Sequence, residues 1–138
     1  MKDCNCIFCK IANGEIPSTT LYEDEDFRVI LDLGPATRGH ALLLPKNHFA
    51  NLFELDDETA QKAILVAKKM AGKMKDALGA DGFNLVQNNG EAAGQTVFHF
   101  HMHLIPRYLN DGNQDKLTWN HAEFTSEEIE EIATELRG

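Results

Sequence analysis

One segment constrains the fold more than any other part of the sequence: it reads His99-Phe100-His101-Met102-His103-Leu104-Ile105. Imidazoles alternate with apolar side chains, and alternation with a period of two is the pattern of a β-strand with two unlike faces. We therefore predict a strand over residues 97–105, with the three imidazoles on one face. Neighbouring imidazoles on that face would start about 6.6 Å apart at their Cα atoms, from a rise of ~3.3 Å per residue. Two such rings can flank one phosphate.

The histidine face permits more than one chemistry. Three of the six histidines in the chain stand within five residues, which is hard to assign to chance. His-x-His on a strand is a good metal-ligand spacing and permits a zinc hydrolase. A nucleophilic histidine, with neighbours that hydrogen-bond the developing charge, is the other interpretation. The preceding loop favours phosphate chemistry, because Gly90 and Gly94 let backbone amides approach an anion, and Gln95 and Thr96 add side-chain donors.

The remaining pattern predicts an α+β fold, a mostly antiparallel sheet with one long central helix and short terminal helices. Further strands are expected over 20–22, 27–32, 40–44 and 83–87. The long helix begins after Asp56 or Asp57 and ends at Gly79, with an inward face of Ala60, Ala63, Ile64, Ala67, Met70, Ala71, Met74 and Leu78. Residues 6–12 form the first short helix. The capping box Thr125-x-x-Glu128 opens the last one, with an inward face of Ile129, Ile132, Ala133 and Leu136.

Length and charge exclude several classes of protein. The 138 residues are enough for a single domain over 1–138. The net charge of −9 disfavours binding to nucleic acid, which usually needs a basic face. The longest aliphatic run, residues 41–44, is far too short to span a membrane, and no signal peptide is evident. We expect a cytoplasmic protein.

Three cysteines crowd the N-terminus, and their odd number argues against a disulfide framework. The spacing Cys6-x-x-Cys9 is that of half a zinc site. A buried apolar pair and a redox dithiol are the alternatives that the spacing leaves open. Cys4 lies outside the matched spacing, as an alternative ligand or a surface thiol.

The histidine segment matches the His-φ-His-φ-His-φ-φ signature of the histidine triad (HIT) family of nucleotide hydrolases and transferases. Four other segments also resemble family sequence: Cys6-Ile7-Phe8-Cys9-Lys10-Ile11, Gly39-His40-Ala41-Leu42-Leu43-Leu44-Pro45-Lys46-Asn47-His48, Ala93-Gly94-Gln95-Thr96-Val97 and Pro106-Arg107. The resemblance covers residues 6–107 and implies a HIT-like fold, with the C-terminal segment 108–138 appended to the core. It is strongest to the bacterial branch that hydrolyses purine nucleoside phosphoramidates.

The resemblance implies roles for individual side chains. His101 matches the nucleophile, which attacks the α-phosphorus and forms a nucleotidyl-histidine intermediate. His103 and His40 match the residues that bind the α-phosphate and orient the nucleophile. Asp32 matches the carboxylate that accepts hydrogen bonds from the ribose, beside apolar walls of the base pocket at Ile30 and Leu33.

Further nucleotide contacts follow from the same resemblance: Asn88 at the ribose or phosphate, and Gly94, Gln95, Thr96 and Val97 in the phosphate loop. Many family members have serine where Thr96 stands, at the position that protonates the leaving group. Threonine keeps the hydroxyl.

The resemblance also implies one structural zinc ion, on Cys6, Cys9, His48 and His99, and a homodimer that joins two sheets into one. The C-terminal segment could reach a neighbouring subunit's active site in such a dimer. The expected activity is hydrolysis of a purine nucleotide conjugate of AMP or GMP type at its α-phosphate. The alternatives are a dinucleoside polyphosphate hydrolase, a nucleotidyl transferase, and a nucleotide-binding regulatory or interaction protein with vestigial activity that acts through partners.

Overall fold

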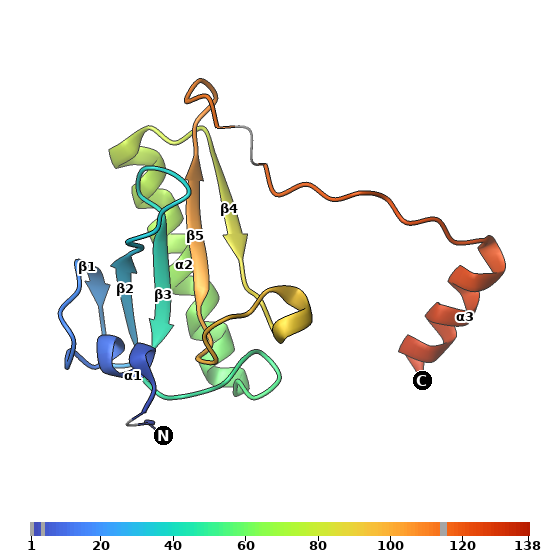
Figure 1. Cartoon of the computed structure of the whole chain (residues 1–138), viewed down its shortest axis with the longest axis horizontal. Helices are drawn as coiled ribbons and strands as arrows, with labels where there is room; N and C mark the ends of the chain where they lie inside the picture. The colour runs from blue at the N-terminus through green and yellow to red at the C-terminus, as the bar shows by residue number, and fades with distance from the viewer. Residues whose placement is uncertain (1, 4, 114–115) are drawn as a thin grey trace.

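The computed structural model describes residues 2–3, 5–113 and 116–138, so Cys4 lies outside the described residues. The elements in chain order are α1 (Ile7–Ala12), β1 (Thr20–Glu23), β2 (Phe27–Leu31), β3 (Ala41–Pro45), α2 (Asp57–Leu78), β4 (Gly82–Val86), the 3-10 turn η1 (Glu91–Ala93), β5 (Met102–Arg107) and α3 (Ser126–Arg137). The strands form one antiparallel sheet in the order β1-β2-β3-β5-β4 (Figure 1). The predicted α+β class with an antiparallel sheet is confirmed.

Helix α2 covers one face of the sheet, and its ends are as predicted. The Asp56 carboxylate accepts a hydrogen bond from the Thr59 amide at the N-terminus, and Gly79 ends the helix with φ 67°. The core between α2 and the sheet contains Phe27, Val29, Ala41, Leu43, Ala63, Val66, Ala67, Met70, Met74 and Leu104. The predicted inward face was wrong at Ile64, whose side chain is 48% exposed, and it missed Val66, which is buried.

Helix α1 packs on the opposite face of the sheet. Ile30, Leu42 and Leu44 point to this face, where Phe8 and Ile11 of α1 lie against them. The strand register pairs Leu42 with both Ile30 and His103. Residues that pair directly across antiparallel strands share a face, so the His103 imidazole lies on the α1 side of the sheet and away from α2.

The predicted strand over 97–105 was wrong at its start, because β5 begins only at Met102. Its ladder to β3 ends at Leu43↔Met102 and its ladder to β4 ends at Val86↔His103. Before that point the chain follows a different partner, and the Phe100 amide donates to the Phe49 carbonyl. His99 and His101 therefore precede the strand, in a segment held by the loop after β3 instead of by the sheet.

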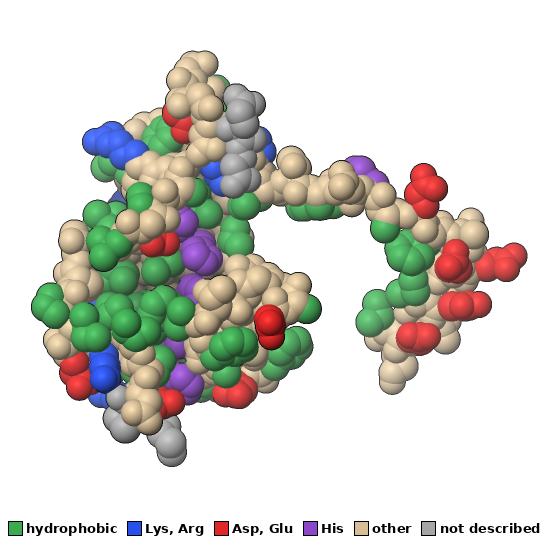
Figure 2. Space-filling model, in the orientation of Figure 1, with side chains coloured by type: hydrophobic (Ala, Val, Ile, Leu, Met, Phe, Trp, Pro, Cys, Tyr) green, Lys and Arg blue, Asp and Glu red, His purple; other side chains and the backbone are tan. Residues whose placement is uncertain are grey.

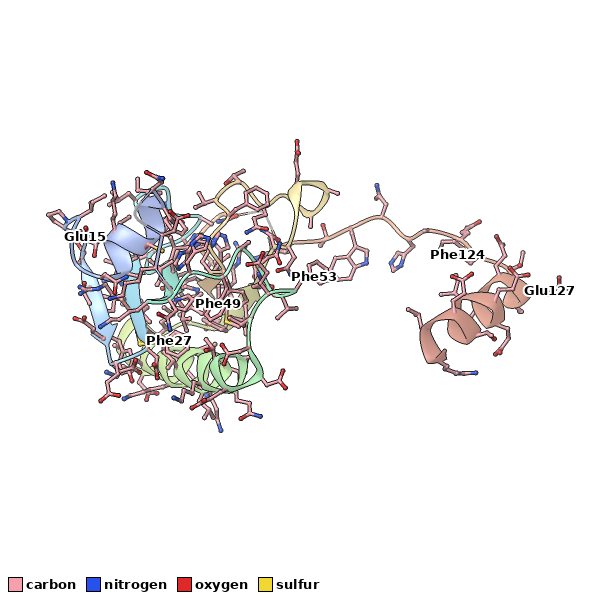
Figure 3. The ribbon with its side chains drawn as sticks, turned by 90° about the horizontal axis from the view of Figure 1, so that it is seen from below. Glu15, Phe27, Phe49, Phe53, Phe124 and Glu127 are labelled. Carbon is pink, nitrogen blue, oxygen red and sulfur yellow. The ribbon has the colours of Figure 1, made fainter. Side chains whose placement is uncertain are left out.

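The C-terminal arm (residues 108–138, described apart from 114–115) runs away from the body and ends in α3 (Figures 1 and 3). Both hydrogen bonds of the predicted capping box form between Thr125 and Glu128. The predicted inward face of α3 was wrong, because no described residue of α3 is buried and Ile129 and Leu136 are 55% and 83% exposed. Trp119 in the arm is 79% exposed.

No helix in the described part of the chain combines the length and apolar character needed to cross a membrane.

Candidate functional site

Imidazoles from three segments gather on the α1 side of the sheet, where they form a column on the surface of the body (Figure 2). His103 lies in β5, His40 directly precedes β3, and Asp32 directly follows β2. The order β2-β3-β5 makes these strands neighbours, so residues far apart in sequence meet at one end of the sheet. His101 lies next along the column, with its ring centroid 5.2 Å from that of His103.

Hydrogen bonds fix which nitrogen of His40 and His103 carries the proton. The Ala36 amide donates to His40 Nδ1 at 2.9 Å, so a neutral His40 carries its hydrogen on Nε2. That nitrogen is 3.0 Å from His103 Nδ1 and 3.4 Å from Asp32 Oδ2. His103 Nδ1 therefore accepts, and its Nε2 carries a hydrogen that it can donate. We call Ala36, His40 and His103 the donor chain.

The orientation of His101 is the reverse of that of His103. Its Nδ1 is 2.7 Å from the His99 carbonyl, which can only accept, so Nδ1 carries the hydrogen. The lone pair of His101 is then on Nε2, the nitrogen turned away from the backbone. The Phe8 ring stands edge-on to His101 at 5.0 Å between centroids and helps to bury it. The site thus holds one imidazole with a free lone pair beside another with a free N–H.

Burial keeps these imidazoles neutral. Desolvation, with smaller contributions from the charges of His101 and His40, lowers the pKa of His103 to about 4. Desolvation also lowers the pKa values of His101 and His40. The Arg107 cation opposes protonation of His40, whereas Asp32 favours it. At neutral pH the column therefore acts through a lone pair and hydrogen-bond donors, and not through imidazolium charge.

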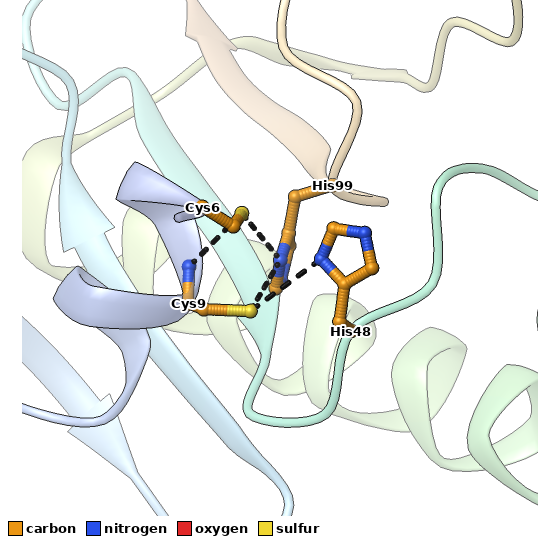
Figure 4. Close-up of side chains that lie close together, drawn as sticks. All are labelled: Cys6, Cys9, His48 and His99. Carbon is orange, nitrogen blue, oxygen red and sulfur yellow. Dashed lines mark hydrogen bonds between the residues drawn. The ribbon is translucent and has the colours of Figure 1, made fainter. Parts of the chain in front are cut away.

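A second cluster joins the N-terminus to the histidine segment (Figure 4). The ligand atoms of Cys6, Cys9, His48 and His99 all lie within 4.8 Å of one another. His99 Nδ1 is 3.4 Å from both sulfurs, and His48 Nδ1 is 3.4 Å from Cys9 Sγ. Two thiols and two imidazoles are a set that suits tetrahedral zinc.

The orientation of His99 fits a metal ligand. Its Nε2 is 2.8 Å from the Pro45 carbonyl and must donate, which leaves the Nδ1 lone pair directed at the two sulfurs. Metal-bound histidines usually have their other ring nitrogen held by an acceptor in this way. Burial lowers the pKa of His99 to about 4, so the lone pair is free at neutral pH. These observations support a metal site, and weakly indicate zinc.

The loop before the triad uses most of its donors internally. The Gln95 amide group donates to the carbonyls of Ala50 and Val97 and accepts from the Gly90 amide. The Gly94 amide donates to the Glu91 carbonyl. The amides of Gly90 and Gly94 and the side chain of Gln95 therefore shape the loop, and their predicted contact with phosphate stays a prediction.

Other predicted nucleotide residues fall in different places. Thr96 is exposed, and with Val97 it lines a hollow of ≈510 Å³ beside Cys6 and His48. Asn88 is half-buried. Ile30 is 5% exposed and belongs to the core beneath α1, whereas Leu33 is 96% exposed. Asp32 keeps 22% of its side chain exposed, and its Oδ1 accepts from the Gly34 amide.

Two contributors to the site were missed at the sequence level. The Ala36 amide sets the proton position of His40, but a backbone group has no residue signature. Arg107 was seen only as part of a family segment. Its Nε donates to Asn84 Oδ1, and its Nη atoms are buried without a partner among the described residues.

A family model of the HIT domain matches residues 13–110. This chain belongs to the HIT family. A HIT family protein from Bacillus anthracis str. 'Ames Ancestor' is 43% identical, with a TM-score of 0.88, and the match covers 97% of this chain and 96% of that one. The predicted family and HIT-like fold are confirmed.

Two other HIT proteins bear on chemistry. The adenosine 5'-monophosphoramidase of Schizosaccharomyces pombe is 37% identical over 132 residues, which is 96% of each chain. A Zn-bound histidine triad family protein from Mycobacterium smegmatis is 37% identical with a TM-score of 0.74, and the match covers 95% of this chain and 97% of that one. Family and relatives together support nucleotide hydrolysis as the general activity.

Proposed function

We propose that this protein hydrolyses purine nucleoside 5′-phosphoramidates at the α-phosphorus, through a nucleotidyl intermediate on His101. The single observation that carries this proposal is the orientation of the His101 ring. Its Nδ1–H is tied to the His99 carbonyl at 2.7 Å, so the Nε2 lone pair is available for attack. A neutral imidazole is a competent nucleophile near pH 7. The phosphoramidase activity of the fission-yeast relative supports the substrate class.

The first step forms a bond between His101 Nε2 and the α-phosphorus and breaks the P–N bond. The leaving nitrogen takes a proton, which we assign to the exposed Thr96 hydroxyl, and this hydroxyl is reprotonated from water. In the second step water attacks the α-phosphorus and the His101–phosphorus bond breaks. A proton passes to solvent, and the products are the amine and the nucleoside monophosphate.

The donor chain stabilises the charge that develops on the phosphoryl oxygens. His103 Nε2–H donates to one of them, and it is held in this form by the His40 hydrogen bond at 3.0 Å. Preorganised donors of this kind typically contribute ~10²–10³ in rate each. Asp32, partly exposed at the end of β2, accepts from the ribose hydroxyls. Ile30 and Leu33 then flank the base, and Asn88 contacts the ribose or phosphate.

We assign a structural zinc ion to Cys6, Cys9, His48 and His99. When bound, zinc supplies a closed four-ligand crosslink between α1, the loop after β3 and the triad segment. The crosslink fixes the His99 backbone, whose carbonyl in turn orients His101. The metal cluster therefore positions the nucleophile without taking part in the bond changes.

We assign a homodimer that pairs the β4 edges of two copies. Leu85 in β4 is 40% exposed at the open edge of the sheet, and Phe53, on the side of the body nearer α3, is 85% exposed (Figure 3). An open apolar edge favours pairing with another strand. Antiparallel pairing of two β4 strands would give one continuous sheet.

Rapid quenching in mild base tests the covalent step. Adenosine 5′-phosphoramidate mixed with excess enzyme is expected to give, within one turnover, an adenylyl adduct that mass spectrometry locates on His101. A diadenosine polyphosphate, run in parallel, compares the substrate classes through kcat/KM. Turnover without any adduct in the burst phase would contradict the nucleophile assignment.

A further inference from the structure

Helix α3 is an amphipathic helix with nothing beneath its apolar face. Ile129, Ile132 and Leu136 are 55%, 42% and 83% exposed, and the preceding Phe124 is 56% exposed. An isolated helix of this length is marginal in water, and its stability in a protein comes mainly from packing of the apolar face. In both views of the ribbon α3 lies apart from its own body (Figures 1 and 3). The helix therefore needs a surface that its own body does not supply in this arrangement.

A groove on the body has the matching character. It lies between the β1–β2 edge of the sheet and the C-terminal half of α2, has a volume of ≈400 Å³, and is lined by Leu21, Leu31, Met70, Met74, Ala77 and Leu78. We call it the β1–α2 groove. Arg38 and Lys73 also line it, and no carboxylate is among the described residues that do. The groove is thus apolar with a basic rim.

The charge of α3 is complementary to that rim. The helix carries Glu127, Glu128, Glu130, Glu131 and Glu135 against a single Arg137. Opposite potentials on two surfaces favour their association and fix its orientation. An apolar stripe flanked by glutamates is what an apolar groove with Arg38 and Lys73 at its rim would accept.

The geometry points to the groove of a second copy, an inference that rests on the proposed β4 dimer. Pairing of two β4 edges has a two-fold axis beside β4, roughly perpendicular to the sheet. This rotation moves the β1 edge to the far side of the partner and exchanges the two ends of the sheet. Gly39 and Leu78, the last residue of α2, line the groove, so it lies at the end of the sheet where α2 stops. In Figure 1 α2 stops at the top of the body, whereas α3 lies beyond β4 and lower. That is where the rotation takes the partner's groove.

The arm is long enough for this exchange. Residues 108–125 join the body to α3, and at ~3.3 Å per residue such a segment reaches roughly 60 Å. We propose that α3 of each subunit docks its Ile129, Ile132 and Leu136 face in the β1–α2 groove of the other subunit. Exchange of two identical arms buries both helices and closes the assembly at two copies.

Crosslinking between differently labelled full-length chains tests the exchange. One chain carries Ala133→Cys in α3, and a ¹⁵N-labelled chain carries Ala77→Cys in the groove. After mixing and subunit exchange, a short bismaleimide is expected to join the unlabelled 133 peptide to the labelled 77 peptide. The matched control replaces Ala77→Cys by Lys68→Cys, an exposed position on α2 that does not line the groove. Mass spectrometry separates these products from those of the native cysteines.

The outcomes separate the inference from its premises. A crosslink between labelled and unlabelled chains that is absent from the control supports the exchange. A crosslink within one chain, when both cysteines are in the same polypeptide, would mean that α3 folds back on its own body and would overturn it. A dimer in sedimentation without the 133–77 product would overturn the docking site alone, and a monomer would overturn the dimer as well. Adenosine phosphoramidate turnover by the same samples judges the proposed function separately.

A second variant tests the docking without depending on the reach of the crosslinking reagent. Leu136→Asp places a charge in the apolar face of α3, whose Leu136 is 83% exposed in the isolated subunit, so the body is expected to fold unchanged. The dimer dissociation constant is expected to rise at least tenfold. Glu131→Ala, on the opposite face of α3, is the control and should change it less than twofold. Equal dissociation constants for both variants and the unmodified chain would contradict docking through this face.

Discussion

Two clusters on the same side of the sheet each bring together side chains that could hold a metal ion, but the clusters differ in what they can bind. Cys6, Cys9, His48 and His99 form one, and Asp32, His40 and His103 form the other, each with ligand atoms within 4.8 Å. The difference lies in one imidazole of each cluster, and in the ring nitrogen that faces away from the cluster, which we call its far nitrogen. His99 donates from its far nitrogen to the Pro45 carbonyl and keeps a lone pair for the cluster, whereas His40 accepts the Ala36 amide and turns an N–H toward it.

This contrast assigns the clusters different chemistry. A lone pair beside two thiols suits a metal ion, while an N–H that points into the cluster repels one and suits a phosphoryl oxygen. A backbone carbonyl in one place and a backbone amide in the other make this distinction. Side-chain identity alone would have allowed a metal at both.

The largest expected effect is on the chemical step. His101→Ala removes the Nε2 lone pair, so kcat is expected to fall by at least about 10³-fold, because removal of a nucleophile acts on that step. Nucleotide binding by calorimetry and zinc content by elemental analysis should stay within twofold of the unmodified protein. A matching loss of zinc would instead mean that the two clusters are one functional unit.

The next largest effect is expected when a ligand of the metal cluster is replaced. Cys9→Ser is expected to remove the zinc ion and to lower the free energy of unfolding by more than about 3 kcal/mol, since a structural metal contributes folding energy. Cys9 is buried, at 2% exposure, so serine also leaves a hydroxyl without its metal partner. Chemical denaturation measures the change. Metal-depleted protein that stays fully folded is expected to lose turnover only in part, because His101 is oriented less firmly, and complete loss would argue that the metal takes part in catalysis.

The sequence predicted the sheet, the long helix and the residues of both clusters. Asp56, Gly79 and the Thr125 capping box were predictable because helix ends depend on local hydrogen bonds. The start of β5 was not, since alternation continues through His99 and His101 after the sheet partners have ended. The roles of Gln95 and Ala36 were out of reach for a related reason. Both depend on the pairing of a side chain with particular backbone groups, such as the Ala50 carbonyl for Gln95 and the Ala36 amide for His40, and a sequence does not say which carbonyl or amide a side chain will meet.

The donor chain also predicts the pH dependence of turnover. Burial lowers the pKa of His103 to about 4 from an ordinary 6.5, and only the neutral ring can accept from His40. Burial also lowers the pKa values of His101 and His40, which must be neutral as well, so the acid limb of kcat/KM, which reports the free enzyme, is expected below pH 6.5. The same shift stabilises the folded state fully above pH 6.5, and this contribution is lost as the pH falls from 6.5 to about 4. An acid limb centred near 6.5 would contradict the burial of these three imidazoles, because it is the value of a solvated imidazole.

The smallest expected effect tests whether the hydrogen bond to the far nitrogen of His40 keeps a metal ion out of the Asp32, His40 and His103 cluster. Ala36→Pro deletes the amide hydrogen that His40 Nδ1 accepts. His40 can then carry its hydrogen on Nδ1 and turn a lone pair toward His103 and Asp32, as His99 does toward the cysteines. Two imidazoles and a carboxylate with an open position form a zinc site of catalytic type. The variant is expected to bind a second zinc ion, and added zinc should inhibit its turnover roughly tenfold more strongly than that of the unmodified protein, because the metal occupies the phosphoryl position.

Ala36→Ser keeps the amide and serves as the control for changes in the loop. Zinc stoichiometry is read by elemental analysis after dialysis, and proton positions by ¹⁵N chemical shifts of the imidazoles. If Ala36→Pro and Ala36→Ser bind the same number of zinc ions, the backbone amide is not what keeps the metal out of the donor chain.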